Sequence, residues 1–320
     1  MQILYYPFGW ALGALYSLTH NYLVALIILT VVLRLLLLPS SIKQQKSSAN
    51  QMRLTAKVNK IKRKYVGQNT QEARQKQQQE IQELYSREGF RGMGGGCAPM
   101  ALQLVVMMGL YGAIYQPLQF VLGISAEKIT TLIESLKAFL GEGATVSTRP
   151  QLEILRHIEN LANTGLSDAE FAKVLDFKNS FTAFGFDLTN VPKDDMKTVG
   201  WYLILIPVLA GLTAMLSAVY TMLRQKKTQP DMGQNKMMMG CMMLLTPLMS
   251  GYFSYILPLG IGFYWIFSNI LSFIQMIVMN IFFKPSQLVA AQMIDETVQR
   301  RAREKSIKET KALMDAQQGK

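Results

Sequence analysis

Four long stretches of apolar sequence constrain the fold of this chain more than any other feature. They cover residues 21–41, 98–123, 199–223 and 237–283, and none of them contains an acidic residue. A helix needs about 20 apolar residues to cross a bilayer, so each of the first three is long enough for one crossing. The fourth has 47 residues, roughly 70 Å of helix, which is too long for one crossing. Residues 258–260 (Pro-Leu-Gly) interrupt it, so we expect two crossings there and five in all.

These crossings predict an all-α integral membrane protein. Half of the residues are hydrophobic and only 17% are charged, which is typical of multi-spanning membrane proteins. The chain also holds 20 methionines, which suit either a lipid-facing surface or an adaptable binding surface. The expected spans are residues 21–42, 98–123, 199–223, 237–257 and 258–283.

The charges between the spans indicate which side of the membrane each loop occupies. Residues 43–91 carry a net charge of +8, and residues 224–236 and 284–320 carry +3 each. Residues 123–198 carry −3. Because basic loops stay on the cytoplasmic side, we expect the N-terminus outside and the C-terminus in the cytoplasm.

The segments outside the spans complete the expected organisation. Residues 1–20 are aromatic and lack the basic leading region and cleavage site of a removed signal peptide, so an outer interfacial segment is expected. Residues 43–97 are polar and contain a turn at 67–70, which predicts a cytoplasmic helical hairpin whose second helix is capped by Thr70. This hairpin is either a docking or gating element or a solvated connector. An outer loop is expected at 124–198, a cytoplasmic loop at 224–236 and a basic cytoplasmic tail at 284–320.

Arg34 is the only charged residue before Lys43, and it lies inside the first apolar tract. A charge inside a membrane costs a few kcal/mol, so it normally faces a protein interior or a watery cavity and has a partner. The apolar tracts offer no carboxylate, and we infer that the partner arrives with a substrate. Two other interpretations are that Arg34 extends to the cytoplasmic surface or that it pairs with backbone carbonyls. Thr30, four residues earlier, projects from the same helical face.

The remaining polar residues give no pattern of catalysis or metal binding. The two cysteines and two histidines have no metal-ligand spacing, and residues 92–96 lack the lysine of a phosphate loop. We therefore expect no enzyme activity and no cofactor. Polar side chains in the second and fifth spans are either contacts between helices or the lining of one wet cavity. These are Gln103, Ser268, Asn269, Ser272 and Gln275.

Several sequence motifs, in a consistent order, carry a family resemblance. They are TVVLRLLLLP at 30–39, EIQELYSREG at 80–89 with GGGCAPMALQ at 94–103, FGFDLTNVPK at 184–193 with PVLAGLTAML at 207–216, and LPLGIGFYWIFSNILSFIQ at 257–275. With these motifs the chain resembles the YidC-type membrane protein insertases, in their five-span form.

The resemblance implies a hydrophilic groove that opens to the cytoplasm and to lipid and is closed on the outer side. It also implies a function, the insertion of nascent membrane proteins into a bacterial plasma membrane, with the ribosome and a protein translocation channel as further candidate partners. Arg34 matches the groove arginine of the family, and Gln103 matches its groove glutamine. Thr30 and Trp265 match positions that contact the incoming helix.

One region departs from the family pattern, because residues 124–180 are longer than the usual outer loop. They contain three helical-looking stretches, at 127–139, 151–161 and 168–177. The alternative function is an ion-coupled transporter, but such proteins usually carry acids or histidines in their spans as relays. A structural scaffold is a third interpretation, and it leaves Arg34 without a role.

Overall fold

The computed structural model describes residues 2–68, 70–88, 94–141, 147–228 and 236–318. The described chain is mainly helical, with one two-stranded hairpin. It divides into two compact units, which are described separately below. The first comprises Met1–Leu38, Met100–Lys227 and Met232–Gln275, and the second comprises Pro39–Pro99, Thr228–Asp231 and Met276–Lys320.

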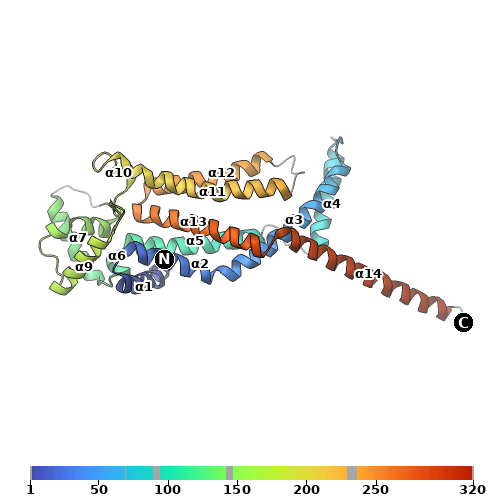
Figure 1. Ribbon diagram of the computed structural model, residues 1–320, viewed down its shortest axis with the longest axis horizontal. Coiled ribbons are helices and arrows are strands. Elements are labelled where there is room, and N and C mark those ends of the chain that lie inside the picture. Colours follow the sequence, from blue (N-terminus) through green and yellow to red (C-terminus); the bar gives the residue numbers. More distant parts are fainter. Residues whose placement is uncertain (1, 69, 89–93, 142–146, 229–235, 319–320) are drawn as a thin grey trace. The chain divides into compact units, whose positions relative to one another are not determined.

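Long helices overlap all five predicted spans (Figure 1). They are α2 (Tyr22–Leu36), α5 (Gly94–Tyr115), α11 (Leu205–Thr228), α12 (Lys236–Ile256) and α13 (Leu259–Phe282). The segment Trp201–Arg224 and helix α13 are each long and apolar enough to cross a membrane, and α2 passes the same test together with α3 (Leu38–Lys64). That test covers only the described residues. It supports two or three crossings, and the count of five stays a prediction.

The break predicted within the fourth apolar tract is confirmed. Helix α12 ends at Ile256 and α13 begins at Leu259. The first backbone amides of a helix have no partner within the helix. Here the amides of Leu259 and Gly260 donate to the carbonyl oxygens of Asn190 (2.8 Å) and Leu188 (3.1 Å). The outer loop therefore caps the start of α13.

Helices α11, α12 and α13 meet at a polar junction. The Nδ2 atom of Asn269 on α13 donates to the carbonyl oxygen of Ala210 (3.1 Å) and to Thr213 Oγ1 (3.3 Å) on α11. It also lies 3.4 Å from Ser250 Oγ on α12. Gly211 lies near the same level, where a Cβ atom would come 3.5 Å from the carbonyl oxygen of Pro247. Asn269 thus connects helices, as one of the two sequence interpretations proposed.

The three helices predicted within the outer loop are confirmed. They are α7 (Ala126–Leu140), α8 (Pro150–His157) with the short helix η1 (Ile158–Asn160), and α9 (Asp168–Ser180). We call residues 124–180 the outer insertion. The rings of Phe177 and Phe181 at the end of α9 pack against Tyr22 at the start of α2, with centroid distances of 5.5 and 4.4 Å. Because all three rings are buried, the outer insertion is part of the hydrophobic core of the first unit.

Short elements connect the outer insertion to the membrane helices. Helix α1 (Gln2–Thr19) packs on α2 and on α6 (Pro117–Phe120). The strands β1 (Thr182–Ala183) and β2 (Phe186–Asp187) form an antiparallel pair. Helix α10 (Pro192–Asp195) and the short helix η2 (Trp201–Ile204) then lead into α11.

Arg156 of α8 binds the segment 189–195, which comprises the turn that follows β2 and helix α10. Its guanidinium makes two bonds to the Asp195 carboxylate, at 3.1 and 3.3 Å. It also donates to Asn190 Oδ1 at 3.0 Å and to Thr189 Oγ1 at 3.4 Å. Because the Asn190 carbonyl caps α13, a single side chain links the outer insertion to the start of that helix.

The second unit contains the predicted hairpin, formed by α3 and α4 (Gln71–Arg87). The predicted cap is confirmed, because Thr70 Oγ1 accepts from the Ala73 amide at 3.3 Å. Glu88 pairs with Arg53 (2.8 Å) and with Lys57 (2.5 Å) on α3. The same unit contains α14 (Pro285–Gln318), a long helix with exposed charges.

Candidate functional site

Arg34 lies in the last turn of α2 and faces α13. Its Nη2 atom donates to the Ser268 hydroxyl at 2.8 Å and to the Ser268 carbonyl oxygen at 3.2 Å. Ser268 is only 4% exposed, and Arg34 is half-buried. No carboxylate among the described residues forms an ion pair with Arg34.

This arrangement refines the sequence-based interpretations of Arg34. The guanidinium does pair with a carbonyl, as one alternative proposed, and with a hydroxyl as well. Both partners are neutral, and both bonds use Nη2. A guanidinium carries five N–H donors in a fixed fork, so Arg34 retains donors for an incoming anion.

Thr30 lies one turn before Arg34 on α2. It is 3% exposed, and its hydroxyl donates to the Leu26 carbonyl oxygen at 2.7 Å. This bond within the helix satisfies the hydroxyl without a partner from another helix. A direct contact between Thr30 and a substrate therefore stays a prediction.

Of the two other predicted site residues, the structure describes the side chain of Trp265 but not that of Gln103. Gln103 belongs to α5, but its side chain lies outside the described residues. Trp265 lies on α13 with its ring 5.8 Å from that of Phe253 on α12. It precedes Ser268 by three residues, about 4.5 Å along the helix axis. Trp265 and the partner of Arg34 are therefore close neighbours on one helix.

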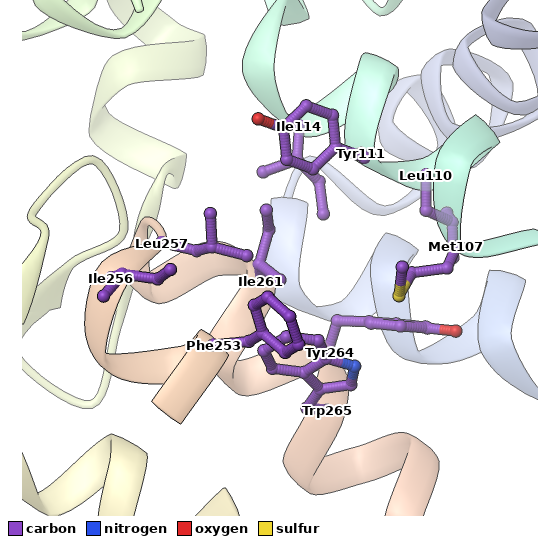
Figure 2. Close-up of a pocket in the computed structure, with 10 residues that line it drawn as sticks. All are labelled: Met107, Leu110, Tyr111, Ile114, Phe253, Ile256, Leu257, Ile261, Tyr264 and Trp265. Atoms are coloured by element: carbon purple, nitrogen blue, oxygen red, sulfur yellow. The ribbon is translucent and has the colours of Figure 1, made fainter. Parts of the chain in front are cut away.

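Trp265 also lines an apolar cavity of about 290 Å³ (Figure 2). Figure 2 shows that its side chains converge from α5, from the end of α12 and from the start of α13. They are Met107, Leu110, Tyr111, Ile114, Phe253, Ile256, Leu257, Ile261, Tyr264 and Trp265. The only polar atoms on these side chains are the two tyrosine hydroxyls, the indole nitrogen and the Met107 sulfur. The cavity therefore suits apolar side chains.

Sequence reasoning missed the pairing of Arg34 with Ser268. Ser268 was recognised only as one of several polar residues in the fifth span. The two residues are 234 positions apart, so no local periodicity links them. The pairing depends on how α2 and α13 pack against each other, for which the sequence offered no signal.

Among the described residues, no group of three or more His, Cys, Asp or Glu side chains is arranged to hold a metal ion. The site combines one half-buried cation, Arg34, with an apolar cavity that Trp265 lines.

Comparison with known proteins points to one family. The model of the 60Kd inner membrane protein family matches residues 14–286. The membrane protein insertase YidC 2 of Listeria innocua is 25% identical over 302 residues, which cover 93% of this chain and 79% of that protein. The membrane protein insertase YidC of Oceanobacillus iheyensis is 32% identical over 161 residues, or 47% of this chain and 62% of that protein. The membrane protein insertase MisCA of Bacillus subtilis is 37% identical over 94 residues, or 29% of this chain and 35% of that protein.

Proposed function

Because the chain belongs to the 60Kd inner membrane protein family, whose matched relatives are YidC membrane protein insertases, we propose how it handles its clients. Nascent hydrophobic segments enter a groove that contains Arg34 and leave it sideways into the bilayer. The groove is open to the cytoplasm, is formed by five transmembrane helices and includes Thr30, Gln103 and Trp265. No covalent step is required.

The observation that carries this proposal is the neutral partner of Arg34. The Ser268 hydroxyl and carbonyl hold the guanidinium in place without cancelling its charge. A client carboxylate can therefore form a charge-assisted hydrogen bond, which is about twice as strong as a neutral one. This bond offsets part of the cost of moving the carboxylate away from water.

The apolar cavity supports the proposed sideways release of the client into the bilayer. Its side chains come from three helices and include Trp265, so apolar residues of a client have a surface to contact beside the cation. Release into lipid then follows from burial of apolar surface, at about 25 cal/mol per Å². The client's own hydrophobicity drives this last step.

The distribution of charge along the chain supports the orientation that we propose in the membrane. We place the protein in a bacterial plasma membrane, with its N-terminus outside and its C-terminus in the cytoplasm. The hairpin and the tail then face the cytoplasm, where nascent chains emerge. The ribosome and a protein translocation channel are the further partners that we propose.

Insertion into proteoliposomes tests the role of Arg34. The client is a single-span protein with an acidic outer tail, and its control is the same span with Asn and Gln in place of the acids. Losing a hydrogen bond to a charged group costs about 1.5–3 kcal/mol, so Arg34→Ala should lower insertion of the acidic client by about tenfold or more. Arg34→Lys should be milder, because the positive charge remains.

Equal insertion of the acidic client by Arg34→Ala and by the unaltered protein would contradict the proposal. Empty liposomes give the background of spontaneous insertion. The neutral client shows whether a variant has lost charge recognition or has lost its fold, since misfolding lowers insertion of both clients.

A further inference from the structure

A second cavity, of about 300 Å³, adjoins the apolar one. It lies at the end of α5 and is lined by Tyr5, Tyr111, Gly112, Tyr115, Gln116, Thr148, Arg149, Ile256 and Leu257. Three of these residues, Tyr111, Ile256 and Leu257, also line the apolar cavity. The two cavities therefore share a wall, and together they form an apolar compartment with a polar one beyond it.

Among the described residues that line the polar cavity, Arg149 is the only charged one. It precedes α8, and its guanidinium interacts with the Tyr115 phenol. Its Nη2 atom lies 3.3 Å from Asp194 Oδ2. The Asp194 side chain is 53% exposed, and an exposed pair with one bond of this length is weak.

The nearby Arg156 provides a contrast within the same protein. Arg156 binds both oxygens of Asp195 as well as Asn190 and Thr189. These four hydrogen bonds hold its guanidinium against one segment of the protein, which indicates a structural role for Arg156. Besides the neutral Tyr115 phenol, Arg149 has one 3.3 Å bond to a solvated carboxylate, so an incoming carboxylate can replace Asp194 at little cost.

We propose that the polar cavity binds an Asp or Glu side chain in the outer flank of a client and that Arg149 is the cation that receives it. The inference rests on the proposed function and deepens it. Trp265 and Tyr264 line the apolar cavity within about one turn of Ser268, which binds Arg34. The path from Arg34 through the apolar cavity to Arg149 therefore presents a cation, an apolar surface and a second cation in sequence.

Such a path suits a client whose hydrophilic outer flank precedes or follows an apolar helix. Its flank carboxylate binds Arg149 while apolar residues at the adjacent helix end occupy the apolar cavity. The tyrosine hydroxyls, Gln116 and Thr148 supply further hydrogen-bonding groups for the flank. Acidic outer flanks are thus the clients that this site favours.

Two substitutions with opposite expected effects test the proposal. Arg149→Gln removes the cation and should lower insertion of the acidic client several-fold, with the neutral client unchanged. Asp194→Asn removes the competing carboxylate and should maintain or raise insertion of the acidic client. If the Arg149–Asp194 pair has only a structural role, both substitutions weaken the same contact, so both should lower insertion of both clients. That result would overturn the proposal.

Arg156→Gln is the matched control, because it neutralises an arginine of the same segment that does not line either cavity. It should affect the acidic and neutral clients alike. A photo-crosslinking residue at Thr148, which is exposed, reports binding directly. It should capture the outer flank of a stalled acidic client more strongly than that of the neutral client, and equal capture would count against the site.

The lipid composition of the vesicles separates a client carboxylate from a lipid phosphate. The effect of Arg149→Gln should be the same in vesicles of neutral phosphatidylcholine and in vesicles with added phosphatidylglycerol. An effect that appears only with the anionic lipid would assign Arg149 to a headgroup and overturn the proposal. If Arg34→Ala impairs the acidic client and Arg149→Gln does not, this inference alone fails. If neither does, the proposed function fails with it.

Discussion

Three arginines of the first unit, Arg34, Arg149 and Arg156, differ in what they bind. Arg34 is held by a neutral serine, Arg149 by one exposed carboxylate and the Tyr115 phenol, and Arg156 by a carboxylate, an amide and a hydroxyl. The number and charge of these partners indicate how much of each cation remains for a ligand. Arg34 retains the most hydrogen-bonding capacity and Arg156 the least, which is why we propose the first for a binding site and the last for a structural role.

Glu170 gives a pH dependence to the outer insertion. Its two carboxylate oxygens each lie 2.6 Å from Lys128 Nζ, and one of them accepts from the Ser167 amide at 2.9 Å. Lys128 and the Ser167 bonds lower the pKa of Glu170 to about 2. The unfolded value is about 4.3, so the pair stabilises α9 fully above that pH. Its contribution is lost as the pH falls through about 2.

Glu170→Gln tests this pair, because glutamine can retain the capping box while losing the charge. The amides of α9 should exchange faster in the variant than in the unaltered protein at pH 6. The ratio of the two exchange rates should approach one as the pH falls from 4 toward 2. A ratio that stays constant over this range would show that the carboxylate charge does not stabilise α9.

At the scale of elements, Arg156 links the outer insertion to the start of α13. The turn that Arg156 binds provides the carbonyl oxygens of Leu188 and Asn190, which cap the first amides of α13. Thr189 and Asn190 are 5% and 6% exposed. Loss of the arginine leaves the buried Asn190 Oδ1 without this donor, at about 1–3 kcal/mol, while the Thr189 hydroxyl keeps its bond to Asp187.

Arg156→Ala should accordingly increase hydrogen exchange at Leu259 and Gly260, which donate to that turn. Arg156→Lys should recover only part of the protection, because an ammonium cannot reproduce a bidentate guanidinium bond. The amides of α4, in the second unit, serve as the internal reference. If the amides at the start of α13 exchange equally slowly in Arg156→Ala, the outer insertion does not stabilise the start of this helix.

The elements were predictable where the signal is local. The three helices of the outer insertion and the second hairpin helix have caps or helical periodicity that can be read along the chain, and their bounds agree within a few residues. The strand pair β1–β2 was missed, because two residues per strand give no alternation to detect. The span predicted at 21–42 also differs, since α2 ends at Leu36 and α3 begins at Leu38, before Pro39.

The candidate site was predictable only in part, for a related reason. Arg34 stands out because a charge in an apolar tract needs a partner, and Trp265 was found through a family motif. The identity of the partner, Ser268, depends on how two distant helices pack. The apolar cavity likewise depends on contacts among α5, α12 and α13, and the polar cavity on contacts among α1, α5 and the residues before α8. No periodicity along the sequence encodes these contacts.

At the scale of the whole molecule, charge is distributed unevenly along the chain. The formal net charge is +12, and the three segments assigned to the cytoplasm hold more of it than the outer loop does. Such a distribution favours contact with anionic partners on one side of the membrane, either ribosomal RNA or lipid headgroups. Residues 43–91 carry the largest net charge, +8, and helix α14 holds a local cluster of exposed basic side chains at Arg300, Arg301, Arg303 and Lys305.

The last prediction concerns this helix. Arg300 and Lys305 are 75% and 79% exposed, and their pairs with Glu304 (3.3 Å) and Glu309 (3.9 Å) are surface i,i+4 contacts. Such pairs contribute about 0.3–0.5 kcal/mol, so the arginines and lysines of α14 remain available to phosphates. We expect the detergent-solubilised protein to sediment with ribosomes at low salt and to dissociate as salt rises, because phosphate binding releases counterions.

Removal of residues 298–320 should abolish most of this salt-sensitive co-sedimentation. The matched control is a full-length variant in which Glu304 and Glu309 are replaced by Gln. It raises the net charge of the helix, so it should bind ribosomes at higher salt than the unaltered protein. Co-sedimentation that is unchanged by the truncation at every salt concentration would show that α14 is not the ribosome contact, and the hairpin of α3 and α4 would then be the basic segment to test.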